Sequence, residues 1–134
     1  MRTLGQKRSE FALNEVLKIE DPDLKKEFKN FSAGAPSMIL QNGFGQALAF
    51  WLSKGTDKDL KVRPNDKHIK LFDIIMYWLS YDNGNDIRNP FATKTNRREL
   101  IKEISEMEQR KYFAAQKETL ALLEWVKRFA NAGL

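Results

Sequence analysis

Cysteine is absent from this 134-residue chain, and histidine occurs only once. The lack of cysteine excludes disulfides, thiolate zinc sites, iron–sulfur clusters and cysteine nucleophiles. The first eleven residues, MRTLGQKRSEF, also lack the apolar stretch of a secretory signal. We therefore expect a cytoplasmic protein.

No long run of apolar residues is present either. The longest uncharged stretch, residues 30–53, has the length of a membrane span, but it contains Pro36, three glycines and the amides of Gln41, Asn42 and Gln46. A bilayer-spanning helix rarely carries so many such residues. We interpret the stretch as a buried core helix of a soluble protein.

Strand patterns are missing as well: Val occurs only at positions 16, 62 and 126, and no segment alternates as a half-buried strand would. Helical periodicity and capping residues are present instead. We predict an all-α fold, a single-domain bundle of about six helices over residues 1–134. The expected helices span Thr3–Glu20, Asp21–Gly34, Pro36–Lys54, Asp66–Tyr81, a short helix from Asn96, and Ser105–Gly133, with loops at 55–65 and 82–95.

Several helix starts have a local chemical explanation. Asp21 is a good N-cap, and Pro22 suits the first helical position. The pairs Asn96 with Glu99 and Ser105 with Glu108 have capping-box spacing. We expect each pair to open a helix.

Gly43 and Gly45 fall inside the third expected helix. Glycine destabilises a helix interior by roughly 1 kcal/mol relative to alanine. We expect both glycines to permit close approach of a neighbouring helix, with the amides of Gln41, Asn42 and Gln46 bonding across the contact. Because no strand precedes them, the pair does not form a phosphate-binding loop.

Catalytic patterns are not found. His68 falls on or beside the apolar face of its helix, where packing is the more common role of a lone histidine. Asp57 with Asp59, and Asp82 with Asp86, lie in polar loops that lack the ligand spacing of a calcium site. We therefore predict no catalytic residue, no metal site and no cofactor.

Binding is a better expectation than catalysis. Lys and Arg outnumber Asp and Glu by 23 to 18, which permits contact with a polyanion without requiring it. The back of the last helix carries Phe113, Leu120 and Trp125 among charged residues. Either another helix of this chain covers them, or they face a partner.

Arg8 presents a similar pair of alternatives. It lies in the apolar sector of the first helix, seven residues before Glu15 and on the same side. It forms an internal ion pair, or its guanidinium is free for phosphate or a partner carboxylate. Of the two, we favour the ion pair.

Three segments together resemble one known family, the small subunit of the type III-B CRISPR effector, the Cmr complex. They are LGQKRSEFAL (Leu4–Leu13), SMILQNGFGQALAFWLSK (Ser37–Lys54) and ALLEWVKRFANA (Ala121–Ala132), in the same order and spacing. The resemblance runs the length of the chain and is weakest from Gly55 to Ser105. Its most specific part is NGFGQALAF, because two glycines in an otherwise good helix are unusual.

The resemblance implies a non-catalytic subunit that stacks in copies along the complex, beside subunits that hold guide RNA and near the target RNA. The basic residues in or beside the matching segments are the expected RNA- or partner-binding residues: Arg2, Lys7, Arg8, Lys18, Lys54, Lys127 and Arg128.

Two other function classes stay open. A stand-alone helical nucleic-acid-binding or regulatory protein would need a recognition helix after a tight turn. A metal-dependent nuclease would need clustered acidic ligands. The sequence offers neither pattern.

Overall fold

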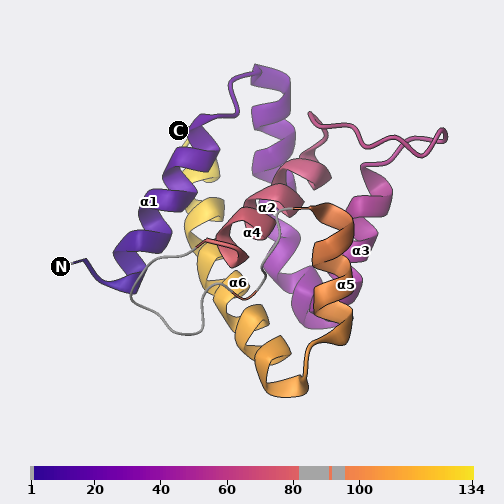
Figure 1. Cartoon of the computed structure of the whole chain (residues 1–134). Helices are drawn as coiled ribbons and strands as arrows, with labels where there is room; N and C mark the ends of the chain where they lie inside the picture. Colours follow the sequence, from indigo (N-terminus) through magenta and orange to yellow (C-terminus); the bar gives the residue numbers. More distant parts are fainter. Residues whose placement is uncertain (1, 82–90, 92–95) are drawn as a thin grey trace.

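In the computed structural model, which describes residues 2–81, 91 and 96–134, the described chain forms six α-helices and no strand (Figure 1). This confirms the predicted all-α bundle. The helices are α1 (Leu4–Leu17), α2 (Pro22–Asn42), α3 (Phe44–Lys54), α4 (Lys67–Leu79), α5 (Arg97–Glu106) and α6 (Gln109–Asn131). Within the described ranges, no helix is both long and apolar enough to cross a membrane.

Helix α4 lies at the centre of the bundle and contacts each of the other five helices (Figure 1). Eight of its 13 residues are buried, among them Phe72 and Trp78, which have no exposed surface. Burial of one large apolar side chain contributes about 1.5–3 kcal/mol. The longest helix, α6, packs mainly along α1 and α2.

Local capping explains most of the helix starts. Asp21 caps α2 ahead of Pro22, and Asn96 accepts a hydrogen bond from the Glu99 amide at 3.1 Å, as predicted. The predicted Ser105–Glu108 box is wrong, because the Ser105 hydroxyl donates to the Ile101 carbonyl within α5. Glu108 itself caps α6, accepting from the amides of Arg110 and Lys111.

The break between the second and third helices differs from the prediction. We expected α2 to stop near Gly34 and a new helix to begin after Pro36, but α2 continues through both residues to Asn42. Pro36 removes one helical hydrogen bond. Continuing the helix buries Ala35 and Ile39 on the same face as Phe28, and this burial offsets that loss.

Gly43 ends α2 instead, with φ 90° and ψ 154°, a conformation essentially restricted to glycine. Its amide donates to the Ile39 carbonyl at 2.8 Å, and its carbonyl accepts from the Ala47 amide at 3.0 Å. One residue therefore terminates α2 and starts α3. Our expectation that Gly43 lies inside a helix is wrong, since backbone conformation, not close packing, requires the glycine here.

Gly45 packs against α6, but the expectation that a glycine is required for this approach is wrong. Its amide donates to the Tyr112 hydroxyl of α6 at 2.9 Å. A Cβ at this position would lie 3.5 Å from that oxygen, an ordinary van der Waals distance. The side chains of Gln41, Asn42 and Gln46, which we expected to bond across the contact, are at least partly exposed.

The two glycines should therefore respond differently to alanine. Gly43→Ala should lower the free energy of unfolding by about 1–3 kcal/mol, because alanine is strained at this φ and ψ. Gly45→Ala should leave it unchanged or raise it by up to about 1 kcal/mol through helix propensity. Urea denaturation of both variants tests this. Equal stability of Gly43→Ala and the parent chain would contradict the account of the break.

Candidate partner and nucleic-acid interface

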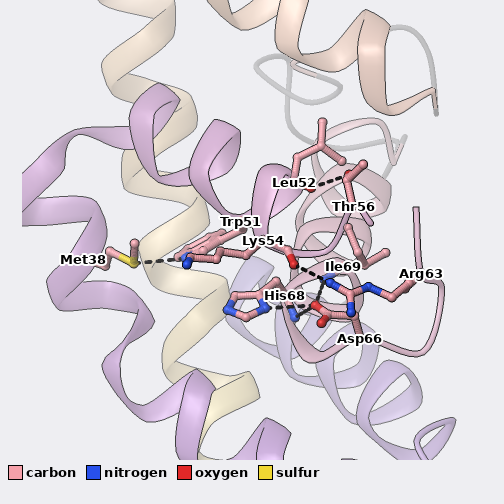
Figure 2. A network of polar contacts seen from close by, with 9 residues as sticks. All are labelled: Met38, Trp51, Leu52, Lys54, Thr56, Arg63, Asp66, His68 and Ile69. Carbon is pink, nitrogen blue, oxygen red and sulfur yellow. Dashed lines mark hydrogen bonds and ion pairs between the residues drawn. The ribbon is translucent and has the colours of Figure 1, made fainter. Parts of the chain in front are cut away.

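The polar residues first considered for catalysis serve local structure. The His68 ring lies 2.9 Å (Nδ1 to Oδ1) from Asp66, the N-cap of α4 (Figure 2). The same ring packs edge-on against Phe31. The Asp57 carboxylate accepts hydrogen bonds from the amides of Asp59 and Lys61, both at 2.9 Å. Asp82 and Asp86 lie outside the described residues. Among the described residues, 2–81, 91 and 96–134, no group of three acidic or histidine side chains could hold a metal ion.

Arg8 forms an internal ion pair. Its Nε and Nη2 donate to the two oxygens of Glu118 in α6, at 2.5 and 2.8 Å. Glu118 also accepts from the indole nitrogen of Trp78 at 2.9 Å. The two charged side chains are only 20% and 7% exposed, so this network is part of the core.

The partner that we expected for Arg8 was wrong. Glu15 instead pairs with Lys18 at 2.7 Å, three residues along α1. Two nitrogens of Arg8 are taken by Glu118, which makes its guanidinium a structural group.

The other basic candidates on or beside α1, Arg2, Lys7 and Lys18, also have partners within the chain. Arg2 pairs with Glu10 at 2.7 Å, and the hydrogen bond to this carboxylate raises the pKa of Arg2. Lys7 is half-buried and has an interaction partner of its own. Lys18 is exposed beyond its contact with Glu15. The Arg2–Glu10 pair is exposed on both sides, and a pair of this kind contributes little stability.

Lys127 and Arg128 share one carboxylate. Glu124 lies 3.3 Å from the Lys127 ammonium and 4.0 Å from the Arg128 guanidinium. One carboxylate balances only one of the two positive charges. The last turns of α6 therefore present a surplus positive charge.

Lys54 lies apart from the other candidates. It is at the end of α3, where its ammonium is 5.4 Å from the centre of the Phe50 ring. Helices α1 and α6 run side by side on the other side of the bundle (Figure 1). The structure thus separates the seven predicted residues into an α1 group, an α6 group and Lys54.

Three lysines of α2 are not among the predicted binding residues but border a hollow in the surface. Lys25, Lys26 and Lys29 border a hollow of about 390 Å³ whose apolar walls include Val16 and Phe28. We group these three lysines with Lys18, which lies just before Ile19 of the same hollow, and with Lys127 and Arg128, which lie within one turn of its Ala130, and call the group the cationic end. The signal that could have identified them is the lysine spacing on an exposed helix face.

This end is of mixed charge. Glu20, Asp21 and Asp23, in and just after the α1–α2 connection, are exposed beside the lysines. Such a surface favours weak, salt-dependent contacts with a polyanion over tight binding.

The apolar residues on the back of α6 were expected either to be covered by another helix of the chain or to face a partner, and each alternative holds for some of them. Leu120 and Trp125 pack against the core, and the Trp125 ring stacks on Phe129 with centroids 5.8 Å apart. Phe113 is 53% exposed. Of these three apolar residues, Phe113 is therefore the one available to a partner.

Comparison with known proteins identifies the family. The sequence model of the family described as CRISPR-associated protein (Cas_Cmr5) matches residues 4–133. The chain belongs to this family. This confirms the resemblance seen in the three sequence segments.

A curated protein and a solved structure that resemble this Cmr5-family chain both come from Thermus thermophilus. The protein named "CRISPR system Cmr subunit Cmr5" is 29% identical over 132 residues, which cover 98% of this chain and 96% of that one. An X-ray crystal structure of a CRISPR-associated Cmr5 family protein superposes with a TM-score of 0.71 and 26% identity, over 98% of this chain and 97% of that one.

The segment that carries the most specific part of the Cmr5 resemblance forms a bend that we call the elbow, residues 38–50, where α2 ends and α3 begins. Leu40 is 67% exposed there, and Phe50 is also exposed. Both lie at or near a hollow of about 540 Å³ that Gln41, Asn42 and Gln46 help to line. Exposed apolar side chains rimmed by amides are typical of a surface that meets another protein.

The Arg8–Glu118–Trp78 network gives a prediction about stability. Glu118→Leu should lower the free energy of unfolding by on the order of 3 kcal/mol, because Arg8 would stay buried without its carboxylate. Adding Arg8→Met should recover much of the loss. Lys127→Gln, at an exposed pair, is the control and should change it by less than about 1 kcal/mol.

Thermal or urea unfolding of the parent chain and these variants gives the comparison. A double variant no more stable than Glu118→Leu alone would show that the unpaired charge is not the cause.

Proposed function

We propose that this chain is a non-catalytic small subunit of an RNA-guided type III-B CRISPR (Cmr) effector complex that acts in antiviral defence. The observation that carries the proposal is the match of the Cmr5 family over residues 4–133. Near-complete coverage of a relative named as a Cmr subunit supports it. In the complex the chain packs against other subunits and copies of itself, and contacts guide or target RNA.

The exposed apolar residues support a role in protein packing. Leu40 and Phe50 on the elbow and Phe113 on α6 are large side chains that the bundle leaves in water. Covering these side chains in an interface would contribute about 25 cal/mol of favourable transfer free energy for each Å² of apolar surface removed from water. Their positions on different helices favour contacts with more than one neighbour.

The cationic end supports an electrostatic contact with RNA. Lys127 and Arg128 carry a surplus positive charge beside Glu124, and the formal charge of the whole chain is +5. A single copy offers few phosphate contacts, so its own affinity should be weak. Several copies along one strand would add their contacts through effective concentration.

The non-catalytic assignment has its own support. His68 is taken by Asp66, and the Asp57 carboxylate by backbone amides. Both contacts are local, at the start of α4 and in the α3–α4 connection, and neither residue belongs to a group of three acidic or histidine side chains that could hold a metal ion within the described part of the chain. Arg8, held by Glu118, is not among the RNA contacts that we propose.

Charge reversal in the reconstituted complex tests the RNA contact. Lys127→Glu combined with Arg128→Glu should weaken target-RNA binding and reduce its salt dependence by about one unit of slope per lost phosphate contact. The measurement is target affinity across a salt series, in complexes assembled with parent or variant chain.

Lys111→Glu combined with Lys117→Glu is the matched control, because it makes the same charge change in the N-terminal half of α6. Unchanged affinity and slope in the Lys127–Arg128 variant would remove these residues from the RNA contact. Failure of that variant to assemble would identify the surface as a protein interface. Failure of the parent chain to join the other Cmr subunits would contradict the proposed function itself.

A further inference from the structure

The connection between α3 and α4 is a tight hairpin, residues 55–63, that projects from the bundle (Figure 1). Thr56 and Val62 pair as an isolated antiparallel bridge, and the Asp57 amide donates to the Lys61 carbonyl at 2.9 Å. The Arg63 amide donates to the Gly55 carbonyl at 2.8 Å. These bonds give the hairpin a defined conformation.

The base of the hairpin is fixed to the helices on both sides (Figure 2). Arg63 donates to the Lys54 carbonyl at 3.0 Å, and the Thr56 hydroxyl donates to the Leu52 carbonyl at 2.7 Å. Gly55 lies so close to Ile69 of α4 that a Cβ there would come within 2.2 Å of its side chain. The position of the tip is therefore set by the fold.

Leu60 at the tip is unfavourable for the isolated chain in two ways. Its side chain is 86% exposed, the highest exposed fraction of any large apolar residue in the described part of the chain. Its φ is 64°, in the left-handed region, where glycine or asparagine would be unstrained and a branched apolar side chain is rare. A single exposed leucine is ordinary. A leucine held outward in a strained conformation points to a partner.

Leu60 borders a groove of about 480 Å³ between the hairpin, α4 and α5. Leu52, Val62 and Met76 supply apolar walls, and the half-exposed Tyr77 lies on the α4 side. The α5 side carries Asn96, Arg97 and Arg98.

The charge of the groove is positive. Arg97 is held by Asp73 through two hydrogen bonds of 2.8 Å, the first cause of its raised pKa. Arg98 is exposed and makes no ion pair within the described residues. No carboxylate is among the described side chains that line the groove. Arg98 can therefore receive one from outside.

We propose that this groove binds a short segment of another Cmr subunit in which an apolar side chain lies next to a carboxylate. The apolar side chain covers Leu60 and the groove walls, and the carboxylate pairs with Arg98. The proposal rests on the proposed function, since the partner belongs to the same complex. Tyr and Arg beside an apolar pocket are typical of energetically important interface residues. RNA is the weaker choice of ligand, because phosphates would leave Leu60 uncovered.

Leu60→Asn separates binding from stability. Asparagine tolerates the left-handed conformation, so the melting temperature of the variant should equal or exceed that of the parent chain. Its affinity for the subunit that occupies the groove should fall tenfold or more. Arg98→Glu should weaken the same binding, whereas Lys102→Glu should not, because Lys102 lies one turn farther along α5 and outside the groove.

The experiment titrates each chain against the other purified Cmr subunits, one at a time, against single-stranded RNA and against itself. Parent-like affinity of both Leu60→Asn and Arg98→Glu for every subunit that binds the parent chain overturns the groove proposal. Loss of RNA binding alone, or of self-association alone, overturns it in favour of those ligands. If the parent chain binds no Cmr subunit, the proposed function fails and the groove proposal falls with it.

Discussion

The rest of the fold depends on the need to cover α4. Eight of its 13 residues are buried and it contacts every other described helix, so an arrangement that left its apolar residues exposed would lose most of the core. The same constraint explains why α2 continues through Pro36 and bends at Gly43. The long α2 and the short α3 both pack against α4.

Helix number, fold class and several caps could be predicted because they depend on residues close in sequence. Asp21 ahead of Pro22, and Asn96 ahead of Glu99, are examples. The position of the bend could not be predicted, because Gly34, Pro36 and Gly43 can each interrupt a helix and burial in the folded chain decides which of them does. The partner of Arg8 lies 110 residues away, and no local pattern specifies it. The strain at Leu60 is likewise a property of the folded hairpin alone.

Three buried or partly buried polar side chains pair with other residues of the chain: Arg8 with Glu118, Arg97 with Asp73, and His68 with Asp66. The exposed side chains that we propose to contact other molecules lie mainly on three surfaces: the elbow, the cationic end and the hairpin groove.

We propose that these surfaces carry the function of the chain. Amide hydrogen exchange, compared between the chain alone and the chain in the reconstituted Cmr complex, tests it most directly. The account predicts added protection in the elbow, residues 38–50, and in the hairpin, residues 55–63, with exchange in α4 unchanged. Equal exchange at both surfaces in a complex that contains the chain would contradict it.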